Sequence, residues 1–138
     1  MIIDHIGYLV KDINKSIEVF KLLGFTQETD IITDDIADGE SSARNVLLCF
    51  LKNEATRVEL VSPIDEKSDV YATLKRQGEG PYHICYRVAD IEESITRLKT
   101  SGWLVLKRPS KAVAFDFSCV AFLFKRGAGM IELVETKE

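Results

Sequence analysis

Two similar stretches of this chain decide its fold: residues 4–25, DHIGYLVKDINKSIEVFKLLGF, and residues 82–103, YHICYRVADIEESITRLKTSGW. Aligned without a gap at a constant offset of 78, they are identical at ten of 22 positions. A second similarity lies near the end of each copy, where residues 58–61 read Val-Glu-Leu-Val and residues 131–134 read Ile-Glu-Leu-Val. The chain is therefore two copies of one structural module.

Each copy begins with a predicted strand and a predicted helix. Apolar residues alternate in 6–10 and in 84–88, which is the period of a half-buried strand. An aspartate, Asp12 or Asp90, then stands where a helix N-cap is expected. Helical spacing predicts the buried stripes Ile13, Ile17 and Phe20 in the first copy and Ile91, Ile95 and Leu98 in the second. The glycines suited to a left-handed C-cap are Gly24 and Gly102.

Three further strands are expected in each copy, so that each reads βαβββ. Their approximate ranges are 25–33, 45–52 and 56–62 in the first copy and 103–107, 119–125 and 129–135 in the second. Residues 66–78 predict a short linking helix that ends at Gly78. We therefore expect one α+β domain over residues 1–138, with a first module at about 1–63 and a second at about 81–136.

Composition excludes several classes of function. A chain of 138 residues with 46% hydrophobic residues suits one globular domain with its own core. A net charge of −4 argues against nucleic acid as a partner, and no apolar stretch approaches the ~20 residues of a membrane span. No secretory signal pattern precedes the first strand. The three scattered cysteines, Cys49, Cys85 and Cys119, predict buried thiols in a cytoplasmic protein rather than disulfides or a zinc site.

The same two polar residue types recur at the same two positions of the repeat. His5 and His83 lie on the first strand of each copy, and Glu59 and Glu132 lie on the last. If a pseudo-twofold axis relates the copies, these four side chains converge. Both glutamates stand between apolar residues, and a carboxylate buried there needs a compensating charge. A strand histidine is more often a core residue and a strand glutamate a solvated one, but that interpretation does not explain the recurrence. The pattern predicts one divalent metal ion held by all four, with zinc, nickel, cobalt, iron or manganese compatible.

The paired βαβββ modules and the order His…Glu…His…Glu resemble the vicinal oxygen chelate superfamily. Its members include glyoxalase I, methylmalonyl-CoA epimerase, extradiol dioxygenases and antibiotic-resistance proteins. The resemblance covers essentially the whole chain. It implies two modules that form an open eight-stranded barrel-like sheet around the metal site, and it implies a homodimer.

Local motifs favour the epimerase branch of this family, although not uniformly. Glu59 matches glyoxalase I, because methylmalonyl-CoA epimerases often have glutamine there. Residues 76–84, RQGEGPYHI, resemble the epimerase segment in which a Gly-Glu-Gly turn leads into the second metal histidine, but Tyr82 stands where the epimerase usually has another histidine. Residues 57–63, RVELVSP, resemble the epimerase's fourth strand, and the turn at 125–129, KRGAG, lacks the Asp-Pro-Asp-Gly of glyoxalase I.

The resemblance therefore predicts a metal-dependent isomerase that moves a proton α to a carbonyl, most like methylmalonyl-CoA epimerase and acting on an acyl-CoA. The first alternative is a lactoylglutathione lyase (glyoxalase I) acting on a glutathione conjugate, and the second is a non-catalytic metal-containing binding or resistance protein.

Proton transfer of this kind needs an electrophile for the enolate oxygen and a carboxylate base. Glu132 is one predicted base, by analogy with glyoxalase I. Glu40 is the other, because residues 38–44, DGESSAR, match loosely the epimerase's Glu-Gln-Gly-Val-Arg; its alternative role is a solvated loop carboxylate. Two roles are open for the basic residues of the second copy, contact with a coenzyme A tail or solvation of loops; these residues are Lys107, Arg108, Lys111, Lys125 and Arg126.

Overall fold

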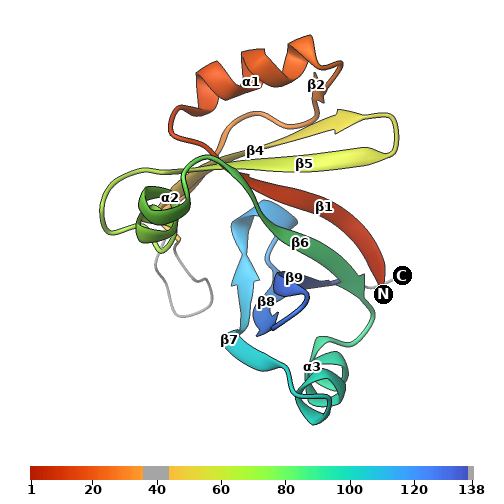
Figure 1. The fold of residues 1–138 in the computed structure, drawn as a ribbon. Helices are drawn as coiled ribbons and strands as arrows, with labels where there is room; N and C mark the ends of the chain where they lie inside the picture. The colour runs from red at the N-terminus through yellow and green to blue at the C-terminus, as the bar shows by residue number, and fades with distance from the viewer. Residues whose placement is uncertain (36–43, 137–138) are drawn as a thin grey trace. The chain divides into compact units, whose positions relative to one another are not determined.

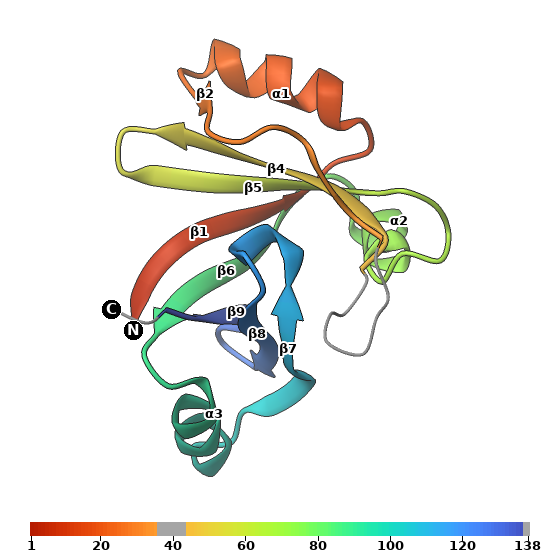
Figure 2. The ribbon, with the colours of Figure 1, turned by 180° about the vertical axis from the view of Figure 1, so that it is seen from behind.

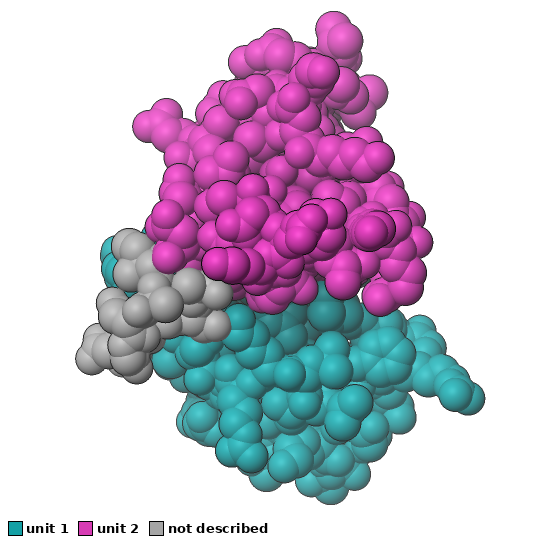
Figure 3. Space-filling view, turned by 90° about the vertical axis from the view of Figure 1, so that its left-hand side faces the viewer, with its two compact units in different colours: residues 1–4, 38–42, 83–138 teal, residues 5–37, 43–82 magenta. Residues whose placement is uncertain are grey.

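The computed structural model describes residues 1–35 and 44–136, and Figures 1 and 2 show the chain from opposite sides. Within these residues there are nine strands, three α-helices and one short 3-10 helix, so the predicted α+β class is confirmed. The residues fall into two compact units, drawn in magenta and teal in Figure 3. Unit 2 spans 5–35 and 44–82 and holds the first copy with the linking helix, whereas unit 1 spans 1–4 and 83–136 and holds the second copy.

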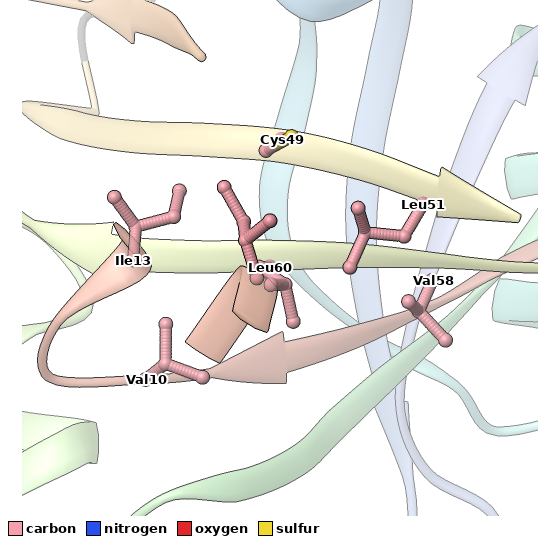
Figure 4. Close-up of a cluster of buried hydrophobic side chains, with 7 residues drawn as sticks. Val10, Ile13, Cys49, Leu51, Val58 and Leu60 are labelled. Atoms are coloured by element: carbon pink, nitrogen blue, oxygen red, sulfur yellow. The ribbon is translucent and has the colours of Figure 1, made fainter. Parts of the chain in front are cut away.

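Unit 2 is a sheet covered on one face by a helix. Its elements are β1 (Ile2–Leu9, which starts in unit 1), α1 (Ile13–Leu22), β2 (Thr26–Gln27), β3 (Ile32–Asp34), β4 (Val46–Asn53), β5 (Thr56–Pro63) and α2 (Tyr71–Gln77). The strand order is β2-β4-β5-β1, with β3 also on β4; β1 runs parallel to β5, and β4 antiparallel to it. Figure 1 shows α1 lying over β4 and β5. The core beneath α1 consists of Val10, Ile13, Ile17, Cys49, Leu51, Val58 and Leu60 (Figure 4). Full burial of each leucine contributes about 1.5–3 kcal/mol to folding.

Unit 1 repeats this arrangement. Its elements are β6 (Gly80–Val88, which starts in unit 2), α3 (Ile91–Thr100), β7 (Leu104–Ala112), η1 (Val113–Phe115), β8 (Ser118–Lys125) and β9 (Gly129–Glu135). The order is β6-β9-β8-β7, with β6 parallel to β9 and β8 antiparallel to it. The core beneath α3 consists of Val88, Ile91, Ile95, Ala121, Leu123, Ile131 and Leu133.

The predicted helix ends are confirmed in both copies. The Asp12 carboxylate accepts a hydrogen bond from Lys15 N at 3.2 Å, and the Asp90 carboxylate accepts one from Glu93 N at 3.0 Å. These bonds satisfy helix N–H groups that have no partner within the helix. Each helix is followed by a glycine at φ +93°, Gly24 or Gly102, a conformation that a residue with a Cβ atom adopts only with strain.

Three element boundaries differ from the prediction. The single strand expected at 25–33 is split into β2 and β3, because Thr29 bonds β4 through its side chain: Thr29 Oγ1 accepts from Phe50 N at 3.1 Å. The linking helix begins at Tyr71 rather than at residue 66. Side chains before it form local turns that compete with a helix, since Asp65 accepts from Lys67 N at 2.9 Å and Ser68 accepts from Val70 N at 3.3 Å.

The third difference is β7, which extends to Ala112 and contains two register shifts against β8. Among the residues that the structure describes, no helix has both the length and the apolar composition needed to cross a membrane.

Candidate metal centre

The first His–Glu pair of the predicted metal centre is assembled within unit 2. His5 on β1 and Glu59 on β5 belong to adjacent parallel strands in which Gly7 is the register partner of Glu59. His5 Nε2 lies 3.4 Å from Glu59 Oε1, and the two residues are 1% and 0% exposed. Glu59 alternates with Val58 and Leu60, which pack beneath α1, so its side chain is on the opposite face of the sheet.

The second pair has the same construction within unit 1. His83 on β6 and Glu132 on β9 lie on adjacent parallel strands, where Cys85 is the register partner of Glu132. His83 Nε2 lies 3.1 Å from Glu132 Oε1, and the two residues are 4% and 1% exposed. In both units the histidine lies two residues before the residue that is the register partner of the glutamate. The histidine and glutamate side chains are therefore on the same face of the sheet. The repeat in the sequence is a repeat of local geometry.

The distances within each pair suit metal ligands. Bonds of about 2.1 Å from a divalent ion to imidazole nitrogen and carboxylate oxygen, at tetrahedral or octahedral angles, put neighbouring ligand atoms about 3.0–3.4 Å apart. The separations of 3.4 Å and 3.1 Å lie in this range. Burial of two carboxylates is costly without a nearby positive charge. Each pair has the donor chemistry and spacing to contribute two ligands to a divalent metal.

A phenylalanine packs against each histidine, which the sequence prediction missed. Phe50 on β4 is the register partner of Glu59, and its ring meets the His5 ring edge to face, with centroids 5.2 Å apart and an interplanar angle of 84°. Phe122 on β8 pairs with Glu132 and meets His83 at 5.5 Å and 87°. The available signal was the dipeptide Phe-Leu, which recurs at 50–51 and 122–123. These contacts limit rotation of both imidazole rings.

The phenylalanine that packs against His5 also contacts an arginine, Arg57. The Arg57 guanidinium lies 4.4 Å from the Phe50 ring centroid, and its Nη2 atom forms an ion pair with Glu28 Oε1 at 2.6 Å. The position that corresponds to Arg57 in the second copy is Met130. Phe50 therefore contacts both the His5 ring and the Arg57 guanidinium.

The remaining predicted site residues have different outcomes. Glu40 lies outside the described residues, so its role as a base stays a prediction. Tyr82, which departs from the epimerase pattern, accepts a hydrogen bond from Arg44 Nη2 at 2.8 Å, and Arg44 is buried at 6% exposed. Tyr82 thus belongs to a polar contact of unit 2.

The prediction of buried cysteines is confirmed for two of the three. Cys49 and Cys85 are buried and Cys119 is half-buried. Burial raises the pKa of the Cys49 thiol, and the Thr29 side chain partly offsets this rise. Cys49 therefore remains a protonated core residue beneath α1.

Comparison with known proteins identifies the family. The sequence profile of the glyoxalase/bleomycin resistance protein/dioxygenase superfamily matches residues 4–135. The chain belongs to this superfamily. Among curated relatives, it is 39% identical over 79 residues to the ethylmalonyl-CoA/methylmalonyl-CoA epimerase of Cereibacter sphaeroides. That match covers 56% of this chain and 59% of the relative, less than two thirds of its length.

Solved structures of the superfamily have the same fold over the whole chain. Methylmalonyl-CoA epimerase from Mycobacterium tuberculosis is 26% identical with a TM-score of 0.79, covering 99% of this chain and 88% of that one. A variant of the Streptomyces coelicolor methylmalonyl-CoA epimerase in complex with 2-nitronate-propionyl-CoA is 25% identical with a TM-score of 0.81, covering 99% and 94%. The resemblance and the fold class predicted from the sequence are confirmed.

Proposed function

We propose that this protein is a metal-dependent epimerase that moves the proton on the carbon next to the thioester carbonyl of an acyl-CoA such as methylmalonyl-CoA. The observation that carries the proposal is the buried His–Glu pair built twice with the same geometry. Similarity to epimerases of methylmalonyl-CoA, in sequence and in fold, supports the choice of substrate.

The four side chains His5, Glu59, His83 and Glu132 would hold a single divalent ion between them. The support is the ligand spacing within each pair and the balance of charge, since two carboxylates match the two charges of the ion. When bound, the ion supplies a Lewis acid that stabilises the negative charge developing on the carbonyl oxygen. The protein's part is to hold both imidazoles in fixed orientations and to keep the carboxylates away from bulk water.

Inversion of the α-carbon requires that the proton leave on one face and return on the other, so two acid/base groups are needed. Glu132 is one, because it is both buried and part of the ligand set. Glu40 is the second, on the strength of the motif at 38–44. We further expect a cytoplasmic location, on the basis of the three scattered cysteines, and a homodimer, as the family resemblance implies.

Deuterium incorporation tests the reaction directly. Methylmalonyl-CoA incubated with the metal-loaded protein in heavy water should exchange its C2 proton, and the metal-stripped protein should not catalyse this exchange. Exchange no faster than in the stripped control would overturn the proposal. Consumption of the methylglyoxal–glutathione hemithioacetal would instead favour a lactoylglutathione lyase. Glu59 is consistent with this alternative, because it matches the glutamate of glyoxalase I at that position. Inactivity in both assays with metal retained would favour a binding protein.

A further inference from the structure

Unit 1 contains an apolar cluster on the face of its sheet that carries His83 and Glu132. The four buried members of this cluster, and the half-buried phenylalanine that packs against them, are Cys85, Ala112, Val120, Val134 and Phe115. Cys85 comes two residues after His83 along β6 and is the register partner of Glu132. Side chains two residues apart on a strand point to the same face, so Cys85 lies on the side of the His–Glu pair rather than beneath α3.

The cluster continues along this face on the two neighbouring strands. Val134 follows Glu132 by two residues on β9, and it is the register partner of Val120 on β8. Val120 in turn precedes Phe122, whose ring packs against His83, by two residues. At about 3.3 Å per residue, the cluster therefore begins about 7 Å along each strand from the His–Glu pair. This distance is within reach of a short alkyl group on a substrate that is held at the pair.

Phe115 supplies apolar volume that the strands of unit 1 lack. In the first copy, the positions that correspond to Arg87 and Val120 are occupied by Leu9 and Leu48, and both leucines are 0% exposed. Valine is smaller than leucine, and Arg87 is only half-buried. The ring of Phe115 comes from the connection between β7 and β8 and packs against the cluster from there.

The turn that follows Phe115 has a strained backbone. Asp116 and Phe117 have φ values of +54° and +64°, in the left-handed region that residues with a Cβ atom adopt at a cost. Two backbone hydrogen bonds hold this turn, since Asp116 N donates to Val113 O at 3.2 Å and Phe117 N donates to Ala112 O at 2.9 Å. Such strain persists only where the surrounding structure enforces it. In this turn, Phe115 packs onto the cluster and Phe117 remains 46% exposed.

We propose that Phe115 sets the size of the alkyl group that the protein accepts on the α-carbon of its acyl-CoA substrate, an inference that rests on the proposed epimerase function. The alkyl group lies against the cluster, and the Phe115 ring closes the end of the space beside it. A methyl group fits this space, whereas each further methylene has to displace the ring. One methylene too many in a hydrophobic pocket lowers kcat/KM by about 10–200-fold.

Turnover of methylmalonyl-CoA, ethylmalonyl-CoA and propylmalonyl-CoA tests this assignment. The wild-type protein should lose at least about 10-fold in kcat/KM at each added methylene, and Phe115→Ala should raise the ratio of kcat/KM for propylmalonyl-CoA to that for methylmalonyl-CoA by at least about 10-fold. Phe117→Ala truncates the exposed phenylalanine of the same turn, so it is the matched control and should keep the wild-type ratio. A loss of folded protein lowers all three rates together and leaves the ratio unchanged. Equal kcat/KM of the wild type for the three substrates, or an unchanged ratio in Phe115→Ala, would overturn the inference.

Equilibrium binding separates this inference from the proposed function. Propionyl-CoA, butyryl-CoA and valeryl-CoA carry the same alkyl groups without the second carboxylate, and calorimetry measures their Kd without turnover. Phe115→Ala should improve the affinity for valeryl-CoA relative to propionyl-CoA by at least about 10-fold, and Phe115→Leu, which removes less of the side chain, should shift it in the same direction.

Absence of turnover in the wild-type protein would refute the epimerase function, while the binding ratios would still decide the role of Phe115. Equal binding ratios in the wild type and both Phe115 variants would refute the role of Phe115 alone. A wild-type protein that neither turns over the three substrates nor binds the three analogues would refute both.

Discussion

Replacing Glu132 by glutamine removes one negative charge from the proposed metal centre and keeps the size of the side chain. Glu132 is 1% exposed and its Oε1 atom lies 3.1 Å from His83 Nε2, so the change acts on ligand chemistry rather than on packing. An ion that binds only the folded protein stabilises it by RT ln(1 + [M]/Kd), about 2.7 kcal/mol at a metal concentration of 100 Kd. For a chain of 138 residues this corresponds to a rise in Tm of about 10 °C.

Loss of an anionic ligand should weaken Kd by at least about 100-fold, since even groups that only support a ligand contribute 10–100-fold. At the same metal concentration the stabilisation of Glu132→Gln then falls to RT ln 2, about 0.4 kcal/mol, and the rise in Tm to about 1–2 °C. Thermal unfolding of the metal-stripped proteins, titrated with Co²⁺ or Zn²⁺, measures both values. Glu92→Gln on the exposed face of α3 makes the same charge change and should keep the full response.

The same measurement on His5→Ala tests whether the two His–Glu pairs share an ion. A shared ion gives one metal per chain by elemental analysis of the wild type. It also reduces the metal-induced rise in Tm of both His5→Ala and Glu132→Gln to about 1–2 °C, although these residues belong to different units. Two ions per chain, or a full rise in Tm retained by either variant, would refute the single-ion centre.

Three further predictions concern residues around this site and the repeat. Arg57→Met, which introduces the residue type found at the corresponding position of the second copy, should weaken metal binding several-fold by loosening the support of His5, measured as the metal-induced change in Tm; unchanged affinity would show that the cation is dispensable. Glu40→Gln should keep the metal and lose turnover, measured by elemental analysis and deuterium exchange, and normal turnover would make Glu40 a loop carboxylate only. Gly102→Ala should lower the free energy of unfolding by about 1–2 kcal/mol in denaturant titrations, because φ is +93° there; equal stability would contradict the assigned backbone conformation.

Much of the fold was predictable from the sequence because its signals are local. The N-caps Asp12 and Asp90 and the glycines after both helices act within one helical turn, and the apolar spacing identified the buried faces of α1 and α3. The internal repeat also allowed the His and Glu positions to be paired. Signals that depend on a distant partner were misread: Thr29 interrupts the predicted strand through its bond to Phe50 on β4.

The sequence by itself determined the two βαβββ copies, the element order and the four candidate ligands, because spacing and repetition are properties of the chain. Tertiary structure alone decided which side chains support those ligands. Phe50 is 45 residues from His5 in the chain, and Arg57 pairs with Glu28, which lies 29 residues before it. Each of these contacts depends on the register of paired strands and on where a helix packs, and no periodicity in the sequence encodes it.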